Sequence, residues 1–206
     1  MKTQYSSVED PLGPGGTRVA IELVTQAEAM GLLDGATELG PLTFSAIDAV
    51  LARLAAAGVA RGVIASLRRA GSVDAAELAD GLRQVKDALD RSPLPEFEWT
   101  ALIDLFGAEE LAMLVGTSET SVNRYARGER ATPDDIAERL HFVARIVADL
   151  RGAYNDIGIR RWFHRPRKAL RGRAPARFLR GAWSPDDPGP TEVKQLSRAL
   201  VFAPAT

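Results

Sequence analysis

The chain contains no cysteine, and this absence excludes disulfide bonds, thiolate zinc sites and thiol catalysis. Its two histidines, His141 and His164, are far apart in the sequence, which leaves little for a histidine-based metal site. We therefore expect neither a metal nor another cofactor. Stability must come from packing of the chain itself.

Long apolar runs are also missing, since none approaches the roughly 18 to 20 residues that a membrane-spanning helix needs. Residues 1–16 lack the basic start and apolar stretch of a signal peptide and carry Glu9 and Asp10 early. We expect a cytoplasmic protein without a membrane partner.

Neither sign of charge is in excess over the whole chain, because the formal net charge is -1. Nothing in the bulk charge draws the molecule to nucleic acid or anionic lipid, so any affinity for DNA must be local. The distribution is uneven, since residues 160–180 hold nine Lys or Arg and no acid. Composition is otherwise that of an ordinary folded protein, and 206 residues allow one large or two small domains.

Helical periodicity dominates the N-terminal half. Residues 1–16 are polar and rich in Gly and Pro, which predicts a disordered tail. Apolar spacing predicts helices over 18–33, 43–57 and 59–70, and Asp74 with Glu77 forms a capping box for a helix to about Asp90. The Pro-rich stretch 92–95 then marks a domain boundary. A winged-helix reader in 43–91 is an alternative, but no DNA-facing polar row occurs there, so packing or dimerisation is favoured for a domain over 17–92.

Residues 108–130 have the pattern of two short helices joined by a tight turn. The first has apolar residues at Leu111, Ala112, Leu114 and Val115, and Gly116 stands where the chain must reverse. Ser118 occupies an N-cap position, Val122 and Tyr125 form a narrow apolar seam, and Gly128 ends the second helix. This arrangement is a helix-turn-helix, whose second helix suits the DNA major groove.

The seam leaves an outward polar row of Glu119, Thr120, Ser121, Asn123, Arg124 and Arg127. Such a row is either a DNA-reading face or simply a solvated helix face. The string ELAMLVGTSETSVNRYARGERATP resembles the helix-turn-helix of the Xre family of phage-repressor-like regulators. That resemblance implies base contacts by Glu119, Thr120 and Arg124, and phosphate contacts by Ser118, Arg127 and Arg130.

The flanking segments complete a helical domain over 95–152. Residues 96–106 place Trp99 on an apolar face, where it is best interpreted as core. Thr132 as N-cap and Pro133 at the first helical position predict a helix to about Arg151. His141 falls off the apolar stripe of that helix and is expected to be a solvated or hydrogen-bonded surface group.

The last part of the chain, 153–206, is a basic module. Trp162, Arg165, Pro166, Leu170 and Gly172, followed by Pro175, Leu179 and an amphipathic stretch at 193–200, resemble the C-terminal toxin-binding domain of Xre/MbcA/ParS antitoxins. The resemblance implies a RES-type toxin or related partner and autoregulation. The residues expected to bind that partner are Arg160, Arg161, Trp162, Arg165, Arg167, Arg171 and Arg173.

The same stretch has other interpretations. Its cations, interleaved with Trp162, Phe163, Phe178 and Trp183, could grip phosphates and stack on bases, or could face an acidic partner. Alternatively, the aromatic residues are the core of a small helical domain whose outside is basic.

No catalytic constellation occurs, since neither histidine lies in a nucleophile or acid–base context. We therefore expect a non-enzymatic, all-α protein with an N-terminal helical domain, an Xre-like helix-turn-helix domain and a small helical C-terminal module. The favoured function is sequence-specific binding of double-stranded DNA as a homodimer, with repression of transcription. The alternative is a protein-interaction module that neutralises or scaffolds a partner through the basic region.

Overall fold

A computed structural model describes residues 13–33, 43–69 and 74–201, and every regular element in these ranges is helical. The expected all-α fold is confirmed. No helix in the described ranges is both long and apolar enough to span a membrane. The chain divides into two compact units, one up to Ser92 and one from Pro93, and each is described by itself.

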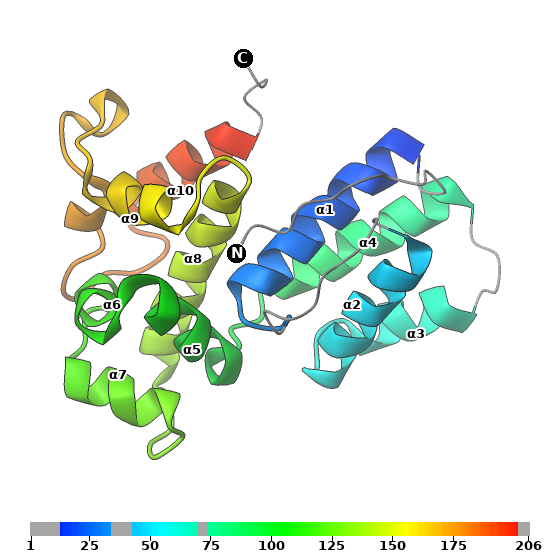
Figure 1. Ribbon diagram of the computed structural model, residues 1–206, viewed down its shortest axis with the longest axis horizontal. Helices are drawn as coiled ribbons and strands as arrows, with labels where there is room; N and C mark the ends of the chain where they lie inside the picture. Colours follow the sequence, from blue (N-terminus) through cyan, green and yellow to red (C-terminus); the bar gives the residue numbers. More distant parts are fainter. Residues whose placement is uncertain (1–12, 34–42, 70–73, 202–206) are drawn as a thin grey trace. The chain divides into compact units, whose positions relative to one another are not determined.

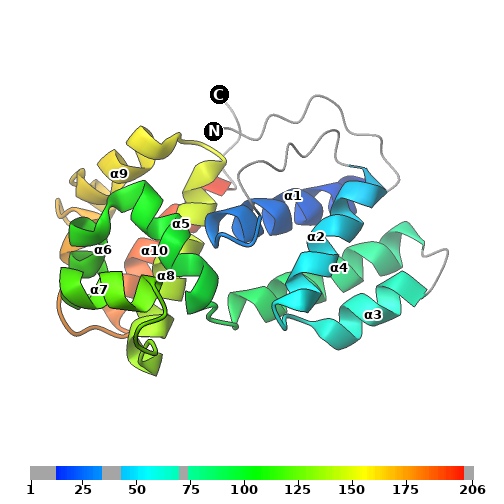
Figure 2. The ribbon, with the colours of Figure 1, turned by 60° about the horizontal axis from the view of Figure 1, so that its bottom comes forward.

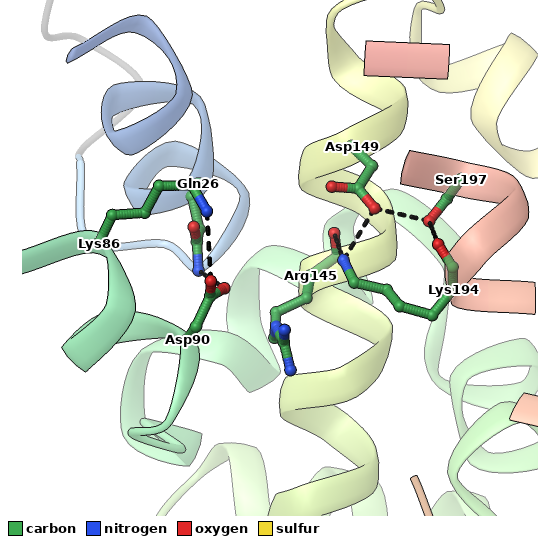
Figure 3. Close-up of polar contacts among 7 residues, drawn as sticks. All are labelled: Gln26, Lys86, Asp90, Arg145, Asp149, Lys194 and Ser197. Atoms are coloured by element: carbon green, nitrogen blue, oxygen red, sulfur yellow. Dashed lines mark hydrogen bonds and ion pairs between the residues drawn. The ribbon is translucent and has the colours of Figure 1, made fainter. Parts of the chain in front are cut away.

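The first unit contains α1 (Gly13–Ala29), α2 (Phe44–Ala56), α3 (Arg61–Arg69) and α4 (Ala75–Asp90). Helix α4 packs along α1 and also contacts α3, while α2 lies against α1 and α3 (Figures 1 and 2). The fully buried side chains include Leu23, Leu54, Ile64 and Leu82, so each helix contributes to one core. Asp90 on α4 accepts a hydrogen bond from Gln26 on α1 (2.9 Å) and pairs with Lys86 (Figure 3).

The predicted start and the predicted end of the first helix both differ from the structure. Residues 13–16 were expected in a disordered tail but begin α1, because the helix starts at Gly13, and the rest of that tail lies outside the described residues. The same helix ends at Ala29, before Gly31 in the left-handed region, rather than at residue 33. Asp74 is confirmed as the N-cap of α4, since its carboxylate accepts from two amides of the first turn.

The second unit contains α5 (Pro95–Phe106), α6 (Ala108–Val115), α7 (Glu119–Ala126), α8 (Asp134–Arg151), α9 (Asp156–His164) and α10 (Pro188–Val201). Two short 3-10 helices, η1 (Lys168–Leu170) and η2 (Pro175–Arg177), lie between α9 and α10. Helix α8 is central and contacts α5, α6, α9 and α10. Its predicted apolar stripe of Ile136, Leu140, Val143, Val147 and Leu150 is buried, as expected.

The described C-terminal residues, 153–201, fall in the same compact unit as the helix-turn-helix. Helix α10 is held on α8 by Asp149, which accepts from Lys194 Nζ at 2.8 Å and from Ser197 Oγ at 2.6 Å (Figure 3). Lys194 Nζ also donates to the carbonyl oxygen of Arg145. The long helix α8 is therefore shared between the two predicted parts.

The predicted surface position of His141 is wrong, although its side chain is hydrogen-bonded, one of the two expected alternatives. Its side chain is buried on α8, with Nδ1 2.5 Å from Oε1 of the fully buried Glu98 on α5. Burial raises the pKa of the Glu98 carboxyl above its ordinary value of 4.5, although the hydrogen bond with His141 acts in the opposite direction. The pair joins two helices that support the helix-turn-helix.

Thr132 is not the N-cap of α8, because the helix begins at Asp134 with Pro133 in the cap position. The hydroxyl of Thr132 instead accepts a hydrogen bond from Trp99 Nε1 at 2.9 Å. Trp99 itself is core, as predicted.

Candidate nucleic-acid interface

Helices α6 and α7 form the two helices of the predicted motif, joined by residues 116–118. Gly116 ends α6 in the left-handed region at φ +72°, and its amide and that of Thr117 donate to the carbonyl oxygen of Ala112. Ser118 then caps α7, since its hydroxyl accepts from the amide of Ser121 at 3.1 Å. The turn and the cap are both confirmed.

The inner face of α7 is anchored by the predicted seam. Val122 and Tyr125 are buried, and the Tyr125 ring stacks on Trp99 of α5 at a centroid distance of 5.6 Å. Because α7 has only eight residues, its own backbone hydrogen bonds give it marginal stability, and packing on α5 supplies the rest. The helix is therefore presented on a rigid support.

The outer face of α7 is polar and largely exposed. Glu119, Thr120 and Arg124 are exposed and have no side-chain hydrogen bond or ion pair with another residue that the structure describes. Ser121 and Asn123 are half-buried at the edge of the seam, so they are less available than predicted. Three of the eight predicted DNA-binding side chains thus combine exposure with free hydrogen-bonding capacity.

The three residues predicted to contact phosphates, Ser118, Arg127 and Arg130, are exposed, but each contacts another side chain of the protein. Ser118 Oγ donates to Ser121 Oγ, and Arg127 Nε lies 2.9 Å from Glu129 Oε1. The guanidinium of Arg130 lies over the ring of Tyr125, 5.7 Å from its centroid. Each contact is at the surface and can be exchanged for a phosphate at small cost.

The predicted partner-binding arginines occupy α9 and the segment around η1. Arg161 and Arg165 are exposed and have no side-chain partner among the described residues, whereas Arg171 pairs with Glu192 of α10. The guanidinium of Arg173 lies over the ring of Phe178, 5.9 Å from its centroid. The guanidinium of Arg167 lies over Trp162 at 5.5 Å. Arg160 donates a hydrogen bond to the carbonyl oxygen of Leu105 at 3.0 Å. Some of the arginines predicted to bind a partner are therefore held by contacts within the chain, and others are not.

Trp162 cannot contact a partner directly, because only 1% of its surface is exposed. Phe163 is also buried, edge-on to Phe106 of α5, and Trp183 is buried against Phe142 of α8. Stacking of these rings on bases is thus excluded in this fold. The interpretation as core is confirmed for Trp162 and Phe163, whereas Phe178 is half-buried under the guanidinium of Arg173.

One feature of the interface was missed from the sequence: a strap, residues 180–184, that is tied to the turn. Trp183 Nε1 donates to the carbonyl oxygen of Leu114 at 3.0 Å. The buried Arg139 of α8 donates from Nε to the carbonyl oxygen of Trp183 (2.6 Å) and from Nη1 to that of Val115 (3.3 Å). These bonds satisfy carbonyls at the end of α6 that have no helical partner.

Gly116 faces the same strap, since a Cβ added to it would overlap the carbonyl oxygen of Gly181. The orange segment between α9 and α10 passes beside the junction of α6 and α7 in both views (Figures 1 and 2). No local pattern in the sequence predicts the hydrogen bond between Arg139 and Trp183. Arg139 lies within an ordinary helical pattern, and Trp183 is 44 residues away from it.

Within the described residues, no group of three or more histidine or acidic side chains is placed to hold a metal ion. Comparison of the chain with protein-family models, with curated proteins and with solved structures gave no match.

Proposed function

We propose that this chain is a sequence-specific, DNA-binding regulator of transcription that reads duplex DNA with the outer face of α7. The observation that carries the proposal is the division of this helix into a buried seam and a face whose Glu119, Thr120 and Arg124 are exposed and unengaged within the described chain. Polar side chains held in this way on a supported helix are available to base edges in a major groove.

Each of the three side chains has a matching base edge. Arg124 can donate two hydrogen bonds to guanine O6 and N7, and Thr120 offers a methyl group to thymine. Glu119 can accept from cytosine N4, and it repels phosphate, so it discriminates between sequences without adding general affinity. Specificity is therefore assigned to these three residues.

Affinity in this proposal comes from phosphates. Ser118, Arg127 and Arg130 flank the reading face, and the exposed Arg127–Glu129 pair is of a kind worth about 0 to 1 kcal/mol, so a phosphate can replace Glu129. A single helix-turn-helix contacts one half-site, so we propose a homodimer on two half-sites about 34 Å apart. Occupation of the chain's own promoter in the cytoplasm would repress transcription.

The test is binding of the purified full chain to a duplex from immediately upstream of its coding region, against a scrambled duplex of equal length. We expect preference for the upstream duplex that persists at about 150 mM salt. Equal, salt-sensitive binding to both duplexes, or no binding, would remove the support for a repressor.

Two substitutions, one on α7 and one at its C-cap, separate contacts to bases from contacts to phosphates. Arg124→Ala should cost about 1 to 3 kcal/mol of binding free energy and relax preference at one base position. Arg127→Ala should weaken binding to every sequence and reduce the slope of log affinity against log salt by about one. Arg198→Ala, which removes an exposed arginine from α10, is the matched control and should bind as the unmodified chain does.

A second candidate is neutralisation of a protein partner, such as a RES-type toxin, through the basic surface of α9. It is favoured by the exposed Arg161 and Arg165 in a stretch without acids. Arg161→Glu with Arg165→Glu should abolish a complex with a purified RES-type toxin in size-exclusion chromatography. Trp162→Ala is unsuitable for this purpose, because truncating a buried tryptophan costs about 3 to 5 kcal/mol of folding stability.

A further inference from the structure

The helix-turn-helix by itself carries no excess of positive charge with which to bind a polyanion such as DNA. Residues 108–131 contain four glutamates and three arginines, and one of those arginines, Arg127, is already paired with Glu129. Because phosphate neutralisation supplies most of the non-specific affinity of DNA-binding proteins, a reading helix in this setting needs cations from elsewhere in the fold.

The strap brings such a cation to the turn. Gly181 lies directly against Gly116, and Trp183 and Arg139 bind the carbonyls at the end of α6. Arg180 immediately precedes Gly181 in the chain, so its backbone is held beside the turn that leads into α7.

Arg180 is exposed and has no ion pair with another described residue. It ends a stretch of the sequence, residues 160–180, that contains no acid. Ser118, which begins α7, is two residues from Gly116, so Arg180 flanks the end of the helix that enters a major groove in this class of motif. A phosphate on the groove edge would meet it there.

We propose that Arg180 is a phosphate-binding residue of the DNA interface, supplied by the C-terminal strap and aligned with α7 by the Gly116–Gly181 contact. This inference rests on the proposed function of α7. It assigns to the strap a part in DNA binding that is independent of any protein partner, and it makes the strap and the helix-turn-helix one functional surface.

A phosphate contact is favoured over a base contact because the strap is bonded to carbonyls at the end of α6, and not to the outer face of α7. Guanidinium groups bind phosphate oxygens through two parallel hydrogen bonds, and such contacts position a protein without selecting a sequence. Arg180 should therefore act on all duplexes alike.

The experiment measures fluorescence anisotropy of labelled upstream and scrambled duplexes with the full chain, over about 50 to 200 mM salt. The variants are Arg180→Ala, the charge-retaining Arg180→Lys, and Arg198→Ala as a control that removes an exposed arginine from α10. Thermal unfolding of each variant verifies that the fold is retained, as expected for exposed positions.

We expect Arg180→Ala to lower the affinity for both duplexes by the same factor, on the order of threefold to tenfold, and to reduce the salt slope by about 0.9. Arg180→Lys should keep the slope, and Arg198→Ala should change neither quantity.

The inference is overturned if the Arg180→Ala variant binds DNA with the same affinity as the Arg198→Ala variant. That result is also expected if Arg180 binds an acidic protein partner. A loss confined to the upstream duplex overturns it as well, because that pattern denotes base reading. Failure of the unmodified chain to prefer the upstream duplex is a separate result, which removes the proposed function and this inference with it.

Discussion

The buried pair of Glu98 and His141 illustrates how one residue contact can link two helices, α5 and α8. Glu98 is fully buried on α5, and its Oε2 has no hydrogen-bond partner among the described residues, while Oε1 lies 2.5 Å from His141 of α8. Desolvation is the largest influence on this carboxyl and raises its pKa above 4.5. The neutral form is thus favoured in the folded state relative to the unfolded state.

This shift makes stability depend on pH in a defined direction. As the pH rises above about 4.5, the unfolded chain releases the Glu98 proton before the folded chain does, so the free energy of unfolding falls until folded Glu98 ionises. Glu98→Gln removes this titration. The stability of the unmodified chain minus that of the variant should therefore decrease from pH 4 to pH 7, as measured by urea unfolding. A difference that stays constant from pH 4 to pH 7 would contradict it.

At the scale of elements, the turn between α6 and α7 is constrained twice. Gly116 has φ +72°, a region that costs a residue with a Cβ about 1 to 2 kcal/mol. It also lacks room, because a Cβ would overlap the Gly181 carbonyl oxygen. Both constraints act on the junction that sets the orientation of α7.

Gly128 provides the matched comparison for this turn. Its φ is +68°, and a Cβ there would meet nothing within 4 Å. Gly128→Ala should therefore cost only the conformational penalty, about 1 to 2 kcal/mol, whereas Gly116→Ala should cost about 1 to 3 kcal/mol more, because the strap must move. Urea unfolding of the two variants measures both values. Equal losses would show that the strap does not press on the turn.

At the scale of the whole molecule, the second unit has its own core around α8. Leu140, Val143, Val147 and Leu150 are fully buried on that helix, which contacts elements on both sides of residue 152. The helix-turn-helix and the described C-terminal elements therefore share one core. The chain divides between Ser92 and Pro93, within the Pro-rich stretch 92–95 where the sequence placed a boundary.

This organisation predicts how fragments behave. A fragment of residues 93–206 should be helical and melt cooperatively, because it contains α8 with all the elements that cover it. A fragment of residues 95–152 should not, because it lacks α10 and the strap and exposes apolar surface of α8. Circular dichroism during heating distinguishes them. Cooperative melting of the shorter fragment at the same temperature would contradict this organisation.

Local signals in the sequence were sufficient for the elements themselves. The 3.6-residue spacing located the helices, Asp74 and Ser118 capped α4 and α7 as expected, and Gly116 marked the turn. Each of these depends on residues within one or two turns of helix, where chemistry and spacing determine the outcome.

Only the tertiary structure decided which distant residues meet. The Glu98–His141 pair spans 43 residues, and the Trp183–Leu114 bond that ties the strap to the turn spans 69. The apolar periodicity of the helix placed His141 at the surface, because periodicity shows only which helical face is apolar. It does not show that a polar side chain will meet a hydrogen-bond partner on another helix. The sequence by itself therefore determined most of the helices, the caps of α4 and α7 and the exposed polar face of α7, whereas the packing of distant segments joined the strap and α8 to the end of α6.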